Sequence, residues 1–136
     1  MAFAMNNTLK NAILGNVVTY MAGTTGTGGT ASLTIRAGDQ PSAESAGTGG
    51  TLCVISGIGW TTGTSGTSNL STSSYTGTAG STGAPGWGRL ECVNTTGTCR
   101  IDGNVGTAST NTFVINVATI TEDGEVTLSA TSIYLA

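Results

Sequence analysis

The chain has 136 residues with no histidine, four basic and seven acidic side chains, and a net charge of −3. Histidine is the usual group for acid–base chemistry near neutral pH, so its absence argues against an enzyme. Four basic residues are too few to follow a phosphate backbone, and no apolar run approaches the roughly 18–20 residues of a membrane span. Composition therefore favours a structural or binding protein that engages neither nucleic acid nor a membrane and needs no cofactor.

Residues 1–20 contain one lysine and apolar residues broken by asparagines, without the compact apolar core of a secretory signal. We therefore expect synthesis in the cytosol and no export by the general route. Threonine, serine and glycine are abundant, but recurring runs of valine and isoleucine favour a folded domain with long polar loops over a disordered chain. The length fits a single domain with a real core.

Asn6 or Asn7 can cap an N-terminal helix, which we expect to end at Gly23. Gly15 and several β-branched residues weaken its intrinsic propensity, so the helix should depend on docking an apolar stripe. That stripe packs either on the chain's own domain or on a neighbouring subunit, and both alternatives stay open. At the spacing of one helical face it contains Leu9, Ile13, Val17 and Tyr20, our interface candidates, followed by Met21.

After this helix and its Gly/Thr linker (residues 1–30), residues 31–136 show the period-two pattern of β-strands. The stretch 61–85 is almost wholly Thr, Ser and Gly and offers at most one weak strand or a long loop. Short strands separated by turns after a single helix predict a mainly β fold, an antiparallel β-sandwich or jelly roll. The expected strands are 32–37, 51–60, 86–93, 98–104, 112–120 and 125–135.

Two neighbouring segments, 88–93 and 98–103, predict a β-hairpin whose register can be specified. Placing Cys92 opposite Cys99 leaves a four-residue loop that ends in a glycine. A slip of one residue would destroy every cross-strand match that this register creates. Two opposite-charge pairs would share the solvent face, and an apolar pair would lie on the other face: Glu91 with Arg100, Arg89 with Asp102, and Leu90 with Ile101.

Three cysteines leave three alternatives open. A Cys92–Cys99 disulfide fits the proposed register, although the cytosol would keep it reduced during assembly. Reduced thiols in the core are the second alternative, and Cys53 on its strand is typical of them. A metal site is the third and weakest, because no second pair of cysteines and no histidine completes four ligands, so we expect no metal.

Aromatic residues and carboxylates are the remaining candidates for a functional site. Trp60, Tyr75 and Trp87 lie within or beside Thr/Ser/Gly-rich stretches, where an exposed ring could stack on a sugar. Core packing at strand ends is the alternative that we favour for the tryptophans. Three carboxylates flank the turn signal Asp123–Gly124, where they keep a turn solvated rather than act as a catalytic pair, so we expect no catalytic residue: Glu122, Asp123 and Glu125.

Four short motifs occur in an order that resembles small virion proteins of tailed bacteriophages. In that family a strand ends in a Gly-x-x-Pro turn, and Gly-Thr-Leu, Gly-Trp-x-Arg-Leu and Asp-Gly-x-Val-Gly segments follow before a closing hairpin. The resemblance spans most of residues 9–135, and its motifs consist mainly of residues that form turns. The matching segments here are Ile35-Arg-Ala-Gly-Asp-Gln-Pro-Ser, Thr48-Gly-Gly-Thr-Leu52, Ala84-Pro-Gly-Trp87-Gly-Arg-Leu90 and Asp102-Gly-Asn-Val-Gly106, with Phe113–Leu135 as the hairpin.

The resemblance implies a capsid decoration (cement) protein that stabilises the phage head by bridging capsomers. Its expected partners are the major capsid protein and further copies of itself, as a homotrimer seated at local three-fold positions. Its location would be the virion head, after synthesis in the host cytoplasm. The alternative is a head-fibre or tail module that recognises the host by binding glycans through Trp60, Tyr75 or Trp87.

Overall fold

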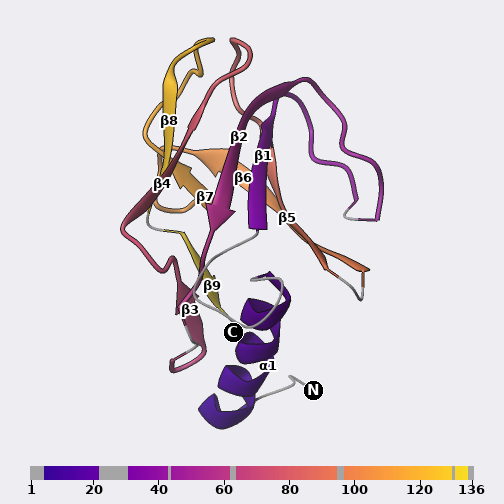
Figure 1. Ribbon diagram of the computed structural model, residues 1–136, viewed down its shortest axis with the longest axis vertical. Helices are drawn as coiled ribbons and strands as arrows, with labels where there is room; N and C mark the ends of the chain where they lie inside the picture. The colour runs from indigo at the N-terminus through magenta and orange to yellow at the C-terminus, as the bar shows by residue number, and fades with distance from the viewer. Residues whose placement is uncertain are drawn as a thin grey trace.

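The computed structural model describes residues 5–21, 31–42, 44–61, 64–94, 97–129 and 131–134. One helix, α1 (Asn7–Met21), lies at one end of the molecule, and strands make up most of the remainder (Figure 1). The predicted linker and the predicted helix end at Gly23 lie outside the described residues. The chain is therefore mainly β with one N-terminal helix, as the sequence predicted.

Nine strands follow the helix in the described part of the chain. Seven of them form one sheet in the order β2-β1-β5-β6-β7-β8-β4, and β3 pairs with β9 in a separate two-stranded sheet. Their bounds are β1 Ala31–Arg36, β2 Thr51–Ile58, β3 Thr67–Asn69, β4 Ser74–Thr78, β5 Trp87–Asn94, β6 Gly97–Gly106, β7 Phe113–Ile115, β8 Glu125–Ser129 and β9 Ser132–Tyr134.

The larger sheet is mixed and nearly closed. Strands β6 and β7 run parallel, whereas the other neighbours in this sheet are antiparallel. The sheet curls until its two ends approach each other, and an isolated bridge joins Cys53 of β2 to Ala79, just beyond β4. The predicted antiparallel sandwich or jelly roll is therefore not confirmed; a purely antiparallel arrangement is wrong for the β6–β7 pair.

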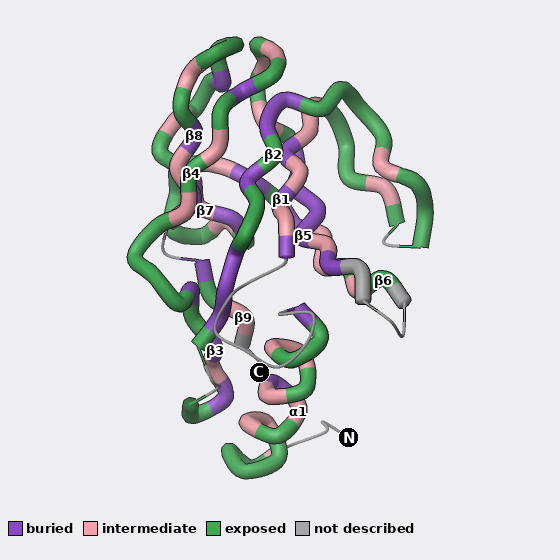
Figure 2. The backbone as a smooth tube through the Cα atoms, viewed as in Figure 1, coloured by how far each residue is buried: buried purple, intermediate pink, exposed green. Residues whose placement is uncertain are grey.

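The core lies on the inner face of this curled sheet. In β1 the residues alternate between buried and half-buried, which is the period-two pattern of a strand with one face in a core. Figure 2 shows the buried residues concentrated along the strands and the exposed ones in the loops. The fully buried large side chains include Leu33, Ile35, Ile55, Ile58, Trp87, Leu90, Phe113, Ile115, Ile120, Val126 and Leu128.

The Thr/Ser/Gly stretch 61–85 contains two strands, so the expectation of at most one weak strand was wrong. Strand β3 pairs with β9, and β4 pairs with β8 over five residues. Both partners lie about fifty residues or more further along the chain, so local composition carried no signal for them. Near the C-terminus, the expected long strands are shorter than predicted: β7 covers only 113–115, and the last segment divides into β8 and β9.

Candidate functional site

Helix α1 turns to the rest of the chain a face that overlaps the predicted stripe only in part, since Val17 and Met21 of the stripe pack against the core and Leu14, outside the stripe, is also buried. Its first turn is capped by Asn6, whose side-chain oxygen accepts a hydrogen bond from the Leu9 amide at 3.0 Å. The helical residues that are buried are Leu14 and Met21. Asn11 ties the helix to the turn before β3, because its side-chain oxygen accepts a hydrogen bond from the Gly66 amide at 2.8 Å.

The predicted apolar stripe is only partly covered by the described residues of the chain. Leu9 and Tyr20 are each 46% exposed, and Ile13 and Val17 are half-buried. Burial of the whole stripe within this chain was therefore wrong. We call these four residues the open face of α1, and its contact with a neighbouring subunit stays a prediction.

A hollow of about 340 Å³ lies between the C-terminal half of α1 and the β5–β6 hairpin. The open face continues into it, because Val17 and Tyr20 form part of its wall. The rest of the wall comes from Met21 of the helix and from Cys99, Arg100 and Ile101 of β6. The helix and the hairpin therefore present one continuous and largely apolar surface.

The β5–β6 hairpin has the predicted register at every position that the sequence specified. Cys92 lies opposite Cys99, Leu90 opposite Ile101, and Glu91 opposite Arg100. The Glu91–Arg100 pair forms the expected ion pair, with 2.7 Å between Oε2 and Nε, and both side chains are about one-third exposed. The predicted four-residue loop was wrong, because Asn94 and Gly97 pair with each other as the last positions of the two strands, and residues 95 and 96 lie outside the described part of the chain.

The second predicted pair, Arg89 with Asp102, forms but does not lie on the solvent face. The two side chains are only 8% and 2% exposed, with 2.7 Å between Nη2 and Oδ2. The segment after β1 covers them, since Arg89 also donates a hydrogen bond to the carbonyl oxygen of Ser45 at 2.8 Å. The bond to Asp102 raises the pKa of Arg89 further above its already high value, so the guanidinium stays charged.

Two of the three aromatic candidates for sugar stacking are buried. Trp60 is 7% exposed and Trp87 is 1% exposed, so neither offers a ring face to a glycan in this structure, and the core-packing alternative holds. The guanidinium of Arg89 lies 5.4 Å from the centre of the Trp87 ring. Tyr75 is half-buried, and its hydroxyl accepts a hydrogen bond from the Gly59 amide at 3.0 Å.

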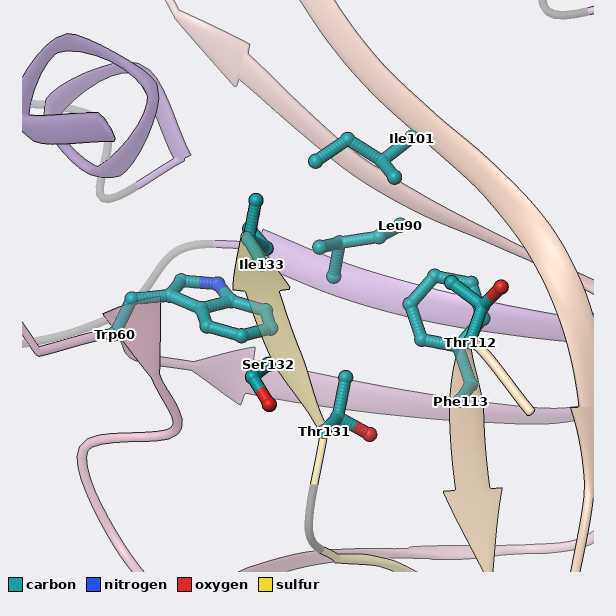
Figure 3. A pocket seen from close by; sticks show the side chains of 8 residues that line it. All are labelled: Trp60, Leu90, Ile101, Thr112, Phe113, Thr131, Ser132 and Ile133. Atoms are coloured by element: carbon teal, nitrogen blue, oxygen red, sulfur yellow. The ribbon is translucent and has the colours of Figure 1, made fainter. Parts of the chain in front are cut away.

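Trp60 lines a second cavity, of about 180 Å³, beneath β9 (Figure 3). The hydroxyl groups of Thr112 and Thr131 are engaged elsewhere, by Asn104 and by the backbone around β7 and β8. Apart from Ser132, the other residues that line the cavity are apolar or aromatic, so the cavity offers packing surface and few polar contacts. The other lining residues are Leu90, Ile101, Phe113, Ser132 and Ile133.

The cysteines are thiols in this structure, Cys53 and Cys92 buried and Cys99 half-buried. Burial raises the pKa of Cys53. Within the described residues, no group of three or more Cys, Asp or Glu side chains is close enough together to hold a metal ion. The acidic segment forms the predicted turn, with Asp123 at a positive φ of 64° and the Gly124 amide bonded to the Thr121 carbonyl oxygen.

Sequence reasoning missed two features of the structure. Val54 is 45% exposed, although it lies within an apolar run that reads as buried strand. The second feature is the contact that covers Arg89, in which the backbone carbonyl groups of Ser42 and Ser45 accept its hydrogen bonds. Every residue carries such a carbonyl group, so the side chains at these positions do not indicate the contact.

No protein-family model, curated protein sequence or solved structure matches this chain. The helix in the described part of the chain is too short and too polar to cross a membrane. The surface formed by the open face of α1 and the adjoining hollow is therefore the candidate functional site, on geometric grounds alone.

Proposed function

We propose that this chain is a capsid decoration (cement) protein, a structural component of a tailed-phage head that bridges capsomers. The observation that carries the proposal is the open face of α1, where Leu9 and Tyr20 are each 46% exposed. The helix has 15 residues, among them Gly15 and three consecutive β-branched residues, Val17, Val18 and Thr19. Such a helix has little stability of its own. Covering this face with a second protein would stabilise the helix and the contact together.

Burial of apolar surface supports an assembly contact energetically. Each square ångström removed from water contributes about 25 cal/mol, so even a small patch of leucine and tyrosine surface gives a weak contact. Weak contacts suffice on a symmetric shell, because copies joined to one another bind many sites at once. The proposed partners are therefore the major capsid protein and further copies of this chain, as a trimer at local three-fold positions.

The rest of the surface supports the same role. The chain has only 11 charged side chains (four basic plus seven acidic) among 136 residues and no histidine. A surface with so few titrating groups responds little to changes of pH or salt, which suits a particle that persists outside a cell. The order of the four virion-like motifs supports the location in the phage head, after synthesis in the host cytoplasm.

The sandwich-like arrangement expected of such a protein also belongs to this proposal. The larger sheet curls so far that Gly77 of β4 lies against the backbone of Val54 in β2. This closure supports an enclosed core, a feature that a curled sheet shares with a two-layer sandwich. The alternative role, a glycan-binding fibre or tail module, retains one of its three aromatic candidates, the half-buried Tyr75, since Trp60 and Trp87 are buried.

The test compares capsids assembled with and without this protein. Capsids that lack it should assemble but rupture at a lower temperature and under milder osmotic shock, because a ligand of the intact shell stabilises it by mass action. Purified protein added back should restore the rupture temperature and saturate at a fixed number of sites per capsid. Unchanged rupture combined with lost adsorption to host cells would instead support the recognition role.

A matched pair of variants tests the part played by the open face. Leu9 and Val54 are exposed to nearly the same extent, 46% and 45%, but lie on α1 and β2 respectively. Leu9→Ala should weaken binding to capsids, whereas Val54→Ala should leave it unchanged if the helix forms the contact. Equal binding of both variants and the parent protein would show that the open face is not the capsid contact.

A further inference from the structure

The outer part of the β5–β6 hairpin is a two-stranded ribbon. Strand β1 pairs with β5 only as far as Glu91, and β7 pairs with β6 only at Val105 and Gly106. Beyond Glu91 and Arg100, these two strands therefore pair only with each other among the described residues. We call this part, residues 92–94 and 97–99, the arm (Figure 1). An isolated two-stranded ribbon is marginally stable in water.

The arm begins with two thiols in direct opposition, Cys92 on β5 and Cys99 on β6. Directly opposed residues of an antiparallel ladder have Cα atoms about 4.5–5.5 Å apart, and disulfides bridge Cα separations of about 4.4–6.8 Å. The Arg89–Asp102 and Glu91–Arg100 ion pairs hold the register next to these thiols. No shift of backbone register is needed to join the two sulfur atoms.

The two thiols differ in their access to solvent. Cys92 is buried, whereas Cys99 is half-buried and forms part of the wall of the hollow beside α1. A small oxidant can therefore reach Cys99 first, with Cys92 placed behind it as the second thiol. Cys53 provides the contrast, because it is buried on β2 opposite Ile35 and has no cysteine across either neighbouring pairing.

We propose that Cys92 and Cys99 are a redox-active pair that forms a disulfide across the arm when the protein meets a low-molecular-weight disulfide such as oxidised glutathione. The Cys99 thiolate attacks one glutathione sulfur, the S–S bond breaks, and one glutathione thiolate leaves. The Cys92 thiolate then attacks the Cys99 sulfur and displaces the second glutathione. The two protein thiols lose two protons and two electrons, and the glutathione disulfide is reduced to two thiols.

This bond would cross-link the two strands of the arm, which pair only with each other among the described residues. In a reducing cytosol the pair stays a dithiol, and outside the cell it closes. The cross-link prevents the ends of the arm from separating, and it fixes the β6 wall of the hollow that adjoins the open face of α1. The inference is independent of the proposed capsid role, because the chemistry requires only the hairpin and an oxidising environment.

The experiment treats the full-length, folded protein with buffers of defined reduced-to-oxidised glutathione ratio. The number of free thiols should fall from three to one (three cysteines minus the two joined), and non-reducing peptide mapping should link Cys92 to Cys99 within one chain. Arg100 offers a second readout, since it is an exposed trypsin site next to the arm. Cleavage there should slow by about tenfold or more on oxidation, because the opened arm becomes rarer.

Two variants make the result specific. Cys53→Ser should retain both the cross-link and the slower cleavage. Cys99→Ser should lose both, and its half-exposed position makes it less disruptive to folding than a change at the buried Cys92. Three persisting free thiols, glutathione that stays attached to Cys99, or cross-links between chains in the folded parent protein would each overturn the proposal.

Discussion

Arg89 and Asp102 form a bidentate ion pair that is almost completely buried. The guanidinium donates from Nε to Oδ1 at 2.8 Å and from Nη2 to Oδ2 at 2.7 Å, and the side chains are 8% and 2% exposed. The Ser45 carbonyl oxygen accepts a further hydrogen bond from Nη1. The pair therefore joins the β5–β6 hairpin to the segment that follows β1.

Asp102→Asn should destabilise the protein strongly. The substitution preserves shape but leaves the Arg89 cation buried without its counter-charge, which costs about 3–5 kcal/mol in the free energy of unfolding. Glu91→Gln on the same hairpin is the matched control, because its partner Arg100 is exposed and the pair contributes at most about 1 kcal/mol. Urea denaturation of both variants measures the difference, and equal losses would contradict the role given to burial.

The two faces of α1 should respond differently to truncation. Leu14 is fully buried, so Leu14→Ala should lower the free energy of unfolding by about 2–5 kcal/mol. Leu9 lies on the open face, and Leu9→Ala should change the stability of the isolated chain by no more than about 0.5 kcal/mol. Denaturation at low protein concentration, where copies are separate, checks this. A large loss in Leu9→Ala would place the stripe in the monomer core after all.

Two adjacent glycines should differ in their tolerance of a methyl group. Gly49 has a φ of +77°, and a Cβ there would collide with the Ala37 carbonyl oxygen, whereas nothing lies near a Cβ at Gly50. Gly49→Ala should cost at least about 1–3 kcal/mol from backbone strain alone. Gly50→Ala should be nearly neutral or slightly stabilising. Thermal unfolding distinguishes them, and similar melting temperatures would contradict the close approach of this loop to the end of β1.

Because of Tyr75, the free energy of unfolding should rise with pH in the alkaline range. Burial raises its pKa, but hydrogen bonds with Ser71, Thr72 and Gly59 outweigh this, and the net pKa lies below the ordinary value. The folded chain therefore releases the proton at a lower pH than the unfolded chain does. Between the folded pKa and about 10, the unfolded state binds more protons, so the free energy of unfolding increases with pH.

Tyr75→Phe should abolish this alkaline gain. It should also cost about 1–3 kcal/mol at neutral pH, because the Gly59 amide loses the acceptor that lies 3.0 Å away. Melting temperatures of parent and variant measured from neutral to alkaline pH provide the check. Parallel pH profiles would show that the hydroxyl does not titrate differently in the two states.

The sequence by itself determined the features whose partners are close along the chain. The hairpin register followed from Leu90, Glu91 and Cys92 and their partners within about a dozen residues, because a short loop and three kinds of side-chain match allow one alignment. The Asn6 cap and the Asp123 turn are equally local. In each case the physical cause lies within a few residues, where sequence patterns record it.

Only the tertiary structure decided the features that depend on distant contacts. Strand β4, Ser-Tyr-Thr-Gly-Thr, carries no alternation of apolar and polar residues that marks it in the sequence, and its position is fixed by β8, which supplies the hydrogen-bond partners. The helix buries Leu14 and leaves Leu9 exposed because its contacts with β3 and β5, both distant in sequence, set its orientation. The apolar residues of the helix do not lie on one face, so they left that orientation undetermined. Arg89 is buried because a distant loop supplies backbone carbonyl oxygens, groups that every residue carries and no sequence pattern distinguishes.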